Sequence, residues 1–384
     1  MADQVYTIEK LVAGGMGIVR DQAQTIFVPF VVPGEQVKIR IAPGARKPIR
    51  AEVKELISSS PDRVEPACPV FTGCGGCQLQ HVAYSRQLQL KNEILAETLA
   101  RLAKIQAEIS AILPSPKPYH YRNRLKLQIQ NGKPGFFAEE KKEFVAIEYC
   151  HLAEEAVNRA ISSLAELIRQ EQPRTIEAIC EAGGALAAVI ESKRGPKIFS
   201  REDEKWRASP EKKIAFQQVN PAQNLKLRET ISALAQEIKP QGIIELYAGA
   251  GNLTEILLPH GAWIVAVEAD RMAGELAQSR FSCVSPAPVN FFIQKAEDFL
   301  AGEWAKKLNP DLILLDPPRT GAKAVIPPII ALKPRHIIYV SCDPASLARD
   351  LKELIFADYQ LRSITPLDMF PQTAHVEAVA MLSR

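Results

Sequence analysis

From about residue 220 onward, short apolar segments alternate with segments of helical spacing, and this alternation constrains the fold more than any other feature. Apolar residues that recur every three or four positions indicate helices, whereas short apolar runs that end in turn residues indicate strands. Strands and helices in alternation predict an α/β fold with a doubly wound, mostly parallel sheet. The four clearest strands are IIELYA, WIVAVEA, LILLD and HIIYVS.

The chain upstream of this region divides into two further units. Residues 5–57 hold four or five short alternating segments separated by glycines and prolines, which predicts a small closed β-barrel of the oligonucleotide-binding kind. An α+β unit follows over 58–210, and its helix near 83–106 is a candidate for packing on the C-terminal unit over 211–384. The basic residues of the 1–57 unit suit either a nucleic-acid surface or a solvated face. They are Lys38, Arg40, Arg46, Lys47, Arg50 and Lys54.

Composition excludes some classes of protein. Hydrophobic residues make up 47% of the 384 positions and the net charge is +3, so we expect a globular chain that tolerates an anionic partner. No apolar run approaches the ~20 residues that span a bilayer, and the first ten residues lack a signal-peptide pattern. We therefore expect a cytoplasmic protein with no membrane association and no obligate protein partner.

A glycine-rich turn follows the first strand of the C-terminal unit. Gly249 and Gly251 allow a ligand to approach the backbone closely, at the strand ends where open α/β sheets bind ligands. Glu268, at the end of the next strand, is placed to accept hydrogen bonds from ribose hydroxyls. Asp298 is expected to end the third strand and to meet an adenine amine. Because the turn reads G-A-G-N-L-T, a dinucleotide is the weaker interpretation, and a domain without a nucleotide is the other alternative.

Three residues near later strand ends are candidates for chemistry. Asp316 ends the fourth strand, before two prolines that stiffen the exit from the sheet. Cys342 follows the fifth strand, where Asp343 and Pro344 suit a helix start, so the helix dipole is expected to lower the thiol pKa below ~8.5. Glu377 lies in an apolar terminal strand, where desolvation is expected to raise its pKa. A buried, inert cysteine and a solvent-facing acid are the alternatives.

Five ordered segments resemble motifs of the RNA 5-methyluridine methyltransferase family. The N-terminal unit is similar to the small TRAM barrel of that family, which binds RNA. The resemblance covers almost the whole chain and implies a Rossmann-like S-adenosylmethionine domain that methylates carbon 5 of a uridine in structured RNA. Ribosomal RNA of the 23S type is favoured as the substrate, and transfer RNA is the alternative. The five segments are FQQVN (216–220), ELYAGAGN (245–252), LLDPPR (314–319), VSCDPASLARD (340–350) and LDMFPQTAHVE (367–377).

The resemblance implies roles for individual residues. Cys342 matches the nucleophile that adds to carbon 6 of uracil, and Glu377 matches the base that removes the carbon 5 proton. Asp316 matches an acid between cofactor and uracil, and Phe216 falls where an aromatic ring lies close to the target base. Asp343 stands where several relatives carry Asn, and either residue can cap the helix. Contacts with S-adenosylmethionine are expected at Gln218, Tyr247, Gly249, Gly251, Asn252, Glu268, Asp298 and Asp316.

The cysteine pattern indicates a metal or redox site, because seven cysteines in a large intracellular chain do not suit a disulfide framework. Cys68, Cys74 and Cys77 are spaced C-x5-C-x2-C, and Cys150 lies far downstream. Relatives with this spacing hold a [4Fe–4S] cluster on four such cysteines, so the resemblance implies one here. From the spacing alone, zinc on four thiolates fits nearly as well. The cysteines that match no role are Cys180 and Cys283.

The basic strand expected over 121–129 offers a second candidate RNA surface through Arg122, Arg124 and Lys126, with solvated charge as the alternative. Two other functions are kept open. One is a methyltransferase for another substrate, such as a cytosine, an amine or a small molecule. Amine methylation would not need Cys342, whereas cytosine enzymes also use a cysteine but do not resemble this chain in its FPQTAHVE segment. A non-catalytic RNA-binding or RNA-folding protein would need neither Cys342 nor Glu377, and their presence argues against it.

Overall fold

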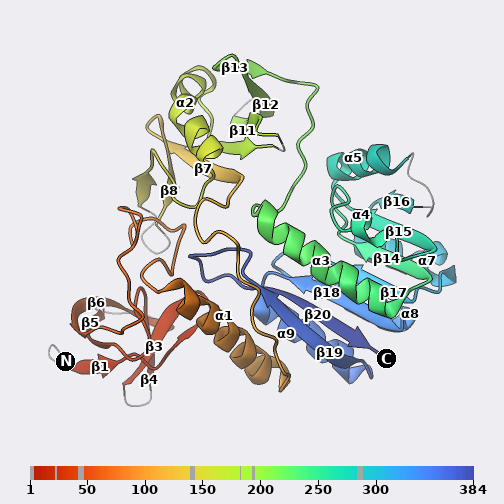
Figure 1. The fold of residues 1–384 in the computed structure, drawn as a ribbon, viewed down its shortest axis with the longest axis horizontal. Helices are drawn as coiled ribbons and strands as arrows, with labels where there is room; N and C mark the ends of the chain where they lie inside the picture. Colours follow the sequence, from red (N-terminus) through yellow and green to blue (C-terminus); the bar gives the residue numbers. More distant parts are fainter. Residues whose placement is uncertain are drawn as a thin grey trace.

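Three β-sheets follow one another along the chain (Figure 1). The computed structural model describes residues 4–21, 24–41, 47–138, 143–181, 183–192, 195–282 and 289–384. Arg46 and Cys283, both named above, lie outside these ranges.

The N-terminal sheet curls around its own apolar core, which includes Ile8, Val28 and Val37. Its strands lie in the order β1-β5-β6-β4-β3-β2, and β4 pairs with β6 in parallel while the other pairs are antiparallel. The six strands are β1 (Val5–Thr7), β2 (Lys10–Val12), β3 (Met16–Asp21), β4 (Gln24–Val28), β5 (Gln36–Ile41) and β6 (Ile49–Ser58).

Acids neutralise part of the basic charge expected on this sheet. The Lys38 ammonium lies 2.9 Å from the Glu55 carboxylate, and the Arg40 guanidinium lies 2.6 Å from the Glu52 carboxylate. Both pairs join β5 to β6 across the antiparallel ladder. Counting basic residues in the sequence therefore overstates the positive charge of this surface.

The middle sheet is antiparallel, and α2 (Glu155–Glu171) packs on it. Val157, Ile161, Leu164 and Ile168 recur at helical spacing along α2, and all are buried against the strands. The strand order is β13-β12-β11-β10-β7-β8-β9. The strands are β7 (Arg124–Gln130), β8 (Lys133–Phe137), β9 (Phe144–Ala146), β10 (Thr175–Cys180), β11 (Leu186–Ser192), β12 (Gly195–Glu202) and β13 (Lys205–Ala208).

The C-terminal sheet is the doubly wound, mostly parallel sheet that the strand–helix alternation predicted. Its order is β16-β15-β14-β17-β18-β20-β19, with β20 antiparallel to both of its neighbours. The order reverses between β14 and β17, and such a reversal is where open α/β sheets bind ligands. The strands are β14 (Gly242–Leu246), β15 (Trp263–Glu268), β16 (Val289–Ile293), β17 (Leu312–Leu315), β18 (His336–Ser341), β19 (Gln360–Leu367) and β20 (Glu377–Ser383).

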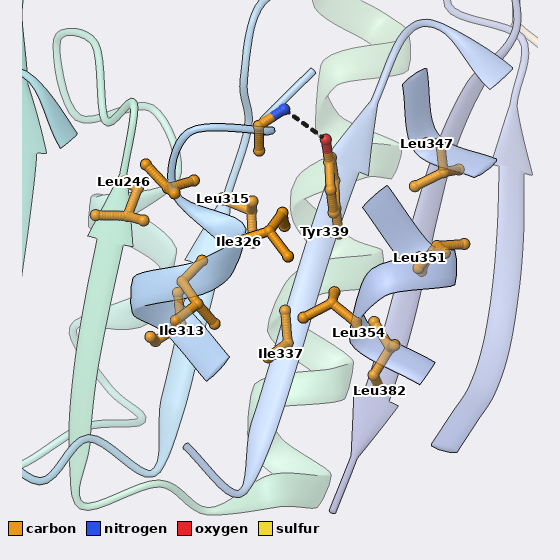
Figure 2. Packing of buried hydrophobic residues seen from close by; sticks show 14 of the residues in the cluster. Leu246, Ile313, Leu315, Ile326, Ile337, Tyr339, Leu347, Leu351, Leu354 and Leu382 are labelled. Carbon is orange, nitrogen blue, oxygen red and sulfur yellow. Dashed lines mark hydrogen bonds between the residues drawn. The ribbon is translucent and has the colours of Figure 1, made fainter. Parts of the chain in front are cut away.

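Helices cover both faces of this sheet because alternate strand residues point to opposite sides. Ile243 and Leu312 pack with α3 and α4, whereas Ile313 and Leu315 pack with α8 and α9 (Figure 2). Each fully buried side chain of this kind contributes ~1.5–3 kcal/mol. The helices are α3 (Pro221–Ile238), α4 (Thr254–Leu257), α5 (Arg271–Phe281), α6 (Ala296–Ala301), α7 (Glu303–Lys307), α8 (Ile326–Leu332) and α9 (Pro344–Phe356).

One helix joins the N-terminal part of the chain to the C-terminal sheet. It comprises α1 (Tyr84–Thr98) and a π-helical turn, η1 (Leu99–Ala103). Leu90 and Ile94 pack with residues of the N-terminal sheet, whereas Leu95 and Leu99 belong to the core of the C-terminal sheet. This helix therefore lies between the two sheets (Figure 1).

Candidate active site at the carboxyl ends of the C-terminal strands

Three titratable side chains meet at one edge of the C-terminal sheet. Asp316 follows β17 and Cys342 follows β18, its parallel neighbour. Glu377 begins β20, which runs antiparallel to β18 so that Ser341 faces Ala378 across the ladder. The start of β20 therefore lies beside the end of β18, which brings Glu377 next to Cys342.

Burial dominates the electrostatics of the two carboxyls. Burial raises the pKa of Glu377 to about 8, with a further contribution from the nearby Asp316 carboxyl. Burial also raises the pKa of Asp316 to about 7. Glu377 is only 3% exposed, which agrees with the desolvation expected from its apolar neighbours in the sequence.

The expected pKa of Cys342 is wrong in direction. Asp343 caps α9 as predicted, because its carboxylate accepts a hydrogen bond from the Ser346 amide at 2.7 Å. Burial nevertheless raises the pKa of the Cys342 thiol to about 11, and the Glu377 and Asp316 carboxyls add to the rise. Desolvation and two acids outweigh a helix dipole, so the thiol is protonated at neutral pH.

Arg319 and His375 complete this edge. The sequence offered His375 only as a weaker candidate for the base than Glu377, and Arg319 was not singled out. The positive charge of Arg319 opposes the rise in the pKa of both Cys342 and Glu377. Its guanidinium donates to His375 Nε2 at 3.2 Å. Burial and the Arg319 charge lower the pKa of His375 to about 4, so the imidazole is neutral and accepts that bond. The LLDPPR motif contains Arg319 and was the signal that could have identified it.

The turn after β14 has the open backbone that the glycines predicted. Gly249 and Gly251 have φ of +56° and +84°, and a Cβ at Gly251 would lie 2.3 Å from the Phe281 ring. Tyr247 also has a positive φ, +63°. Glu268, at the end of β15, accepts hydrogen bonds from the Gly249 amide and the Asp270 amide, each at 2.7 Å. These bonds hold its carboxylate against the turn.

Two side-chain contacts support this turn, and one of them is fully buried. The Asn252 side chain exchanges hydrogen bonds of 2.9 Å with Asn224 on α3. Glu245, inside β14, accepts a hydrogen bond from the Thr254 hydroxyl at 2.6 Å, and burial raises its pKa to about 8. Glu245 was not among the predicted site residues, although a glutamate within the apolar run IIELYA could have identified it.

Asp298 does not end the third strand. β16 ends at Ile293, and Asp298 is an exposed residue in the first turn of α6. No glycine or proline separates Ile293 from Phe299 and Leu300, so the sequence did not mark where the strand stops. The neighbouring Glu297 is close enough to Tyr247 to raise its pKa.

Phe216 and Gln218 lie in the segment that leads into α3. Phe216 is 69% exposed, and Gln218 is half-buried. Asn220 caps α3 and donates to the Met369 carbonyl at 3.2 Å. Through Asn220 this segment is attached to the loop between β19 and β20 (residues 368–376), which leads to Glu377.

Comparisons with known proteins show the family to which the chain belongs. The model of the family described as tRNA (uracil-5-)-methyltransferase matches residues 207–384, and that of the TRAM domain of tRNA (uracil(54)-C(5))-methyltransferase matches residues 5–61. An RNA methyltransferase of Bdellovibrio bacteriovorus is 32% identical, over 98% of this chain and 93% of its own. The chain belongs to the RNA uracil-5-methyltransferase family.

Two further relatives also match nearly the whole length of the chain. The 23S rRNA (uracil(1939)-C(5))-methyltransferase of Pseudomonas putida is 30% identical, over 98% of this chain and 93% of its own. The structure of Pyrococcus abyssi tRNA (uracil-54, C5)-methyltransferase with S-adenosyl-L-homocysteine superposes with a TM-score of 0.72 at 25% identity, over 98% of this chain and 99% of its own. This family member is therefore an S-adenosylmethionine-dependent methyltransferase with an N-terminal TRAM domain.

The four cysteines of the predicted cluster line one cavity in this methyltransferase. Cys68, Cys74, Cys77 and Cys150 share its wall with Arg122, and all four thiols are free. Burial raises the pKa of Cys77 to about 12 and also raises that of Cys74 and of Cys150. Within the described ranges, no group of three or more His, Cys, Asp or Glu side chains is arranged to hold a metal ion. Cys180 is buried at the end of β10.

Arg124 is wrongly predicted as an RNA contact of the methyltransferase. Its side chain is 7% exposed, with its Nε 3.4 Å from the Glu177 carboxylate. Its guanidinium also donates to the Ala215 carbonyl at 3.5 Å, in the segment that leads into α3, so Arg124 is covered rather than exposed. Lys126 is exposed and pairs with Glu191 at 3.2 Å. Arg122 is half-buried and stacks against the Phe370 ring at 5.8 Å.

Among the described residues, no helix is long and apolar enough to cross a membrane.

Proposed function

We propose that the enzyme transfers a methyl group from S-adenosylmethionine to carbon 5 of a uridine in 23S ribosomal RNA, through a covalent adduct on Cys342. The meeting of Cys342, Glu377 and Asp316 at one sheet edge carries the proposal. Three relatives named as 23S rRNA (uracil(1939)-C(5))-methyltransferases, 29–30% identical over 98% of this chain, favour ribosomal RNA. Such a substrate implies that the enzyme works in the cytoplasm.

The reaction begins when the Cys342 thiolate adds to carbon 6 of uracil, because carbon 5 is a weak nucleophile until the ring becomes an enolate. Carbon 5 then attacks the sulfonium methyl group, and S-adenosylhomocysteine leaves. The Glu377 carboxylate removes the proton from carbon 5. The electrons of that C–H bond restore the 5,6 double bond and expel the Cys342 thiolate. Asp316, beside both groups, is suited to hydrogen-bond the edge of the uracil.

The cofactor is proposed to lie over the turn after β14. Gly249 and Gly251 let it approach the backbone, and the Glu268 carboxylate at the neighbouring strand end suits the ribose hydroxyls. Phe216, exposed in the segment that leads into α3, is proposed to contact the target base. The other proposed cofactor contacts are Gln218, Tyr247, Asn252, Asp298 and Asp316.

Turnover is expected to rise with pH between pH 6 and pH 9. Glu377 must be ionised to accept a proton, and with a pKa of about 8 its carboxylate form increases across this range. Cys342 must also be ionised, and with a pKa of about 11 its thiolate form increases with pH as well. The measurement is kcat against pH with a labelled methyl group. A rate that falls from pH 6 to pH 9 would contradict this assignment.

Replacing Arg319 should move this profile to higher pH. Its positive charge lowers the pKa of Cys342 and Glu377, so Arg319→Met should raise both. The matched control is Arg271→Met on α5, whose side chain is 84% exposed. An unshifted profile in Arg319→Met would show that the Arg319 charge does not affect the pKa of Cys342 or Glu377.

We also propose that Cys68, Cys74, Cys77 and Cys150 hold a [4Fe–4S] cluster. Four free thiols on one cavity fit thiolate ligation of iron. A single tetrahedral zinc would draw its four sulfurs to within about 4 Å of one another. Zinc on the same four thiolates is the alternative that metal analysis must exclude. The proposed role is structural, because methyl transfer needs no electron carrier.

Anaerobically purified enzyme is therefore expected to be brown, with about four iron atoms per chain. Iron analysis and absorption spectra of the full chain provide the test. Cys150→Ser should lose the colour and the iron, whereas the control Cys180→Ser should keep both. Stoichiometric zinc in place of iron would overturn the proposal.

Transfer RNA is a second candidate substrate, because the P. abyssi tRNA methyltransferase superposes over 98% of this chain. The deciding experiment incubates the enzyme and labelled S-adenosylmethionine with unmodified ribosomal RNA or transfer RNA, followed by nucleoside mass spectrometry. Labelled 5-methyluridine in the ribosomal pool alone supports the proposal, and label in the transfer RNA pool alone replaces it with the second candidate. No label in either pool, with cofactor bound, would reject both.

A further inference from the structure

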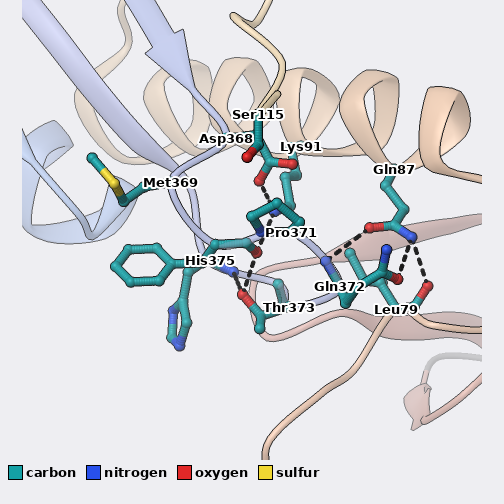
Figure 3. A network of polar contacts seen from close by, with 12 residues as sticks. Leu79, Gln87, Lys91, Ser115, Asp368, Met369, Pro371, Gln372, Thr373 and His375 are labelled. Carbon is teal, nitrogen blue, oxygen red and sulfur yellow. Dashed lines mark hydrogen bonds and ion pairs between the residues drawn. The ribbon is translucent and has the colours of Figure 1, made fainter. Parts of the chain in front are cut away.

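The loop between β19 and β20 (residues 368–376) is held by elements from outside the C-terminal sheet (Figure 3). The amides of Gln78 and Leu79 both donate to the Gln372 carbonyl, at 3.1 Å and 3.0 Å. The Gln87 side chain accepts from the Gln372 amide at 3.1 Å and donates to its side chain at 2.9 Å. The Tyr121 hydroxyl donates to the Pro371 carbonyl at 3.1 Å. The backbone of this loop is therefore fixed by residues far from it in the sequence.

A fully buried ion pair anchors the start of the loop. The Lys91 ammonium on α1 donates to Asp368 Oδ1 at 2.5 Å and to the Phe370 carbonyl at 3.0 Å. Both side chains are 0% exposed. The other Asp368 oxygen, Oδ2, accepts from the Tyr84 hydroxyl at 2.9 Å, and Tyr84 in turn accepts from the Ser115 amide. The carboxylate is thus bonded from two directions by one helix.

This loop carries side chains of the active-site edge. The Phe370 ring meets the His375 ring edge-on at 5.7 Å, and His375 accepts a hydrogen bond from Arg319. Glu377 follows two residues after His375, as the first residue of β20. A shift of the loop backbone would therefore move the base and its neighbours together.

Such a pair is not explained by stability alone. Two charges lose their hydration on burial, and apolar side chains of similar volume often stabilise a core as well or better. The pair instead fixes the position of the loop, because the Lys91 ammonium can bond both Asp368 and the Phe370 carbonyl only when the loop has this arrangement. On the sequence side, Gln87 and Lys91 stand at helical spacing with Leu90, Ile94 and Leu95 on the buried face of α1.

We infer that Lys91 is a positioning residue for methyl transfer: paired with Asp368, it holds the β19–β20 loop so that the Glu377 carboxylate faces the proton on carbon 5. The inference rests on the proposed function. Helix α1 precedes the methyltransferase sheet by more than a hundred residues. Through Lys91 it would affect the step that releases the product from the enzyme.

The test measures that step separately. When Glu377 is displaced, Cys342 still adds to uracil and carbon 5 is still methylated, but the carbon 5 proton is not removed. Methylated RNA then remains bound to the protein as a denaturation-resistant adduct. Displacement of a catalytic group by about 1 Å costs on the order of 10²-fold in rate. The variant Lys91→Met/Asp368→Leu, which leaves no buried charge alone, is expected to accumulate the adduct with turnover slowed to that extent and cofactor affinity unchanged.

Two further variants keep the test decisive if the double variant does not fold. Tyr84→Phe removes one hydrogen bond to Asp368 and keeps both charges, so we expect the same adduct with turnover slowed roughly 5-fold. Arg86→Met on the same helix, whose partners are Asp62 and Glu93, is the matched control and should behave as wild type. Folded Lys91 and Tyr84 variants that turn over at the wild-type rate, or that lose adduct and methyl transfer equally, would overturn the inference.

Glu377→Gln separates this inference from the proposed function. If wild type forms 5-methyluridine and Glu377→Gln accumulates the adduct, the proposed chemistry holds and the Lys91 result judges the inference alone. If wild type forms no 5-methyluridine, or Glu377→Gln accumulates no adduct, the proposed function fails and the inference falls with it.

Discussion

Replacing Cys342 with alanine is expected to reduce methyl transfer on the order of 10⁴-fold or more, with S-adenosylmethionine binding unchanged. Without the thiolate, carbon 5 of uracil is not activated, and no other described cysteine lies at this edge of the sheet. The cofactor turn after β14 lies two strands away and does not involve Cys342. The measurement is single-turnover 5-methyluridine formation, together with cofactor binding by calorimetry.

The matched control is Cys180→Ala, because Cys180 is a buried cysteine on the middle sheet and should leave the rate unchanged. RNA that carries 5-fluorouridine at the target position should trap the wild-type enzyme covalently, because fluorine cannot leave as a proton does. The trapped peptide should contain Cys342. Residual activity of Cys342→Ala within tenfold of wild type would indicate a mechanism without an adduct, such as the one used for amines.

Replacing Lys91 with methionine is expected to lower the free energy of unfolding by about 3–5 kcal/mol, the usual cost of leaving one partner of a buried ion pair alone. Asp368 would keep its hydrogen bond from Tyr84 but would face an apolar side chain inside the core. Chemical denaturation of the full chain, followed in the transition that includes the C-terminal domain, provides the measurement.

The double variant Lys91→Met/Asp368→Leu should recover most of that loss, because it buries no unpaired charge. The control is Lys226→Met on α3, whose pair with Glu229 is exposed and should contribute no more than about 1 kcal/mol. If Lys91→Met alone were as stable as wild type, Asp368 would have to be protonated or hydrated in the variant. The view of the pair as an isolated buried contact would then be wrong.

The fold of the C-terminal domain could be predicted because its signals are local. Apolar runs such as LILL and IIYV reveal buried parallel strands, and residues such as Asp343 and Asn220 cap the helices that follow. Local patterns fail where nothing marks a boundary. Asp298 was expected to end the third strand, but no glycine or proline marks the boundary after Ile293, where β16 ends before α6 begins.

The chemistry of the site depended on neighbours that no local pattern reveals. Helix capping by Asp343 suggested an acidic thiol, but Glu377 lies beside Cys342 because β20 inserts antiparallel to β18. Burial with two carboxyls then raises the pKa of the thiol. Arg124 likewise looked like an exposed cation, but the fold buries it beside Glu177 and the Ala215 carbonyl.

The sequence by itself determined that Asp316 and Cys342 follow buried strands and that a glycine turn follows β14, because apolar runs, glycine turns and helix caps are properties of neighbouring residues. It therefore determined the fold class and the candidates Cys342, Glu377 and Asp316. Only the tertiary structure decided their ionisation and the alignment of the loop that leads to Glu377, where α1 supplies Lys91 from far upstream. Burial and charge–charge distance are set by segments remote in the chain, so no window of sequence contains them.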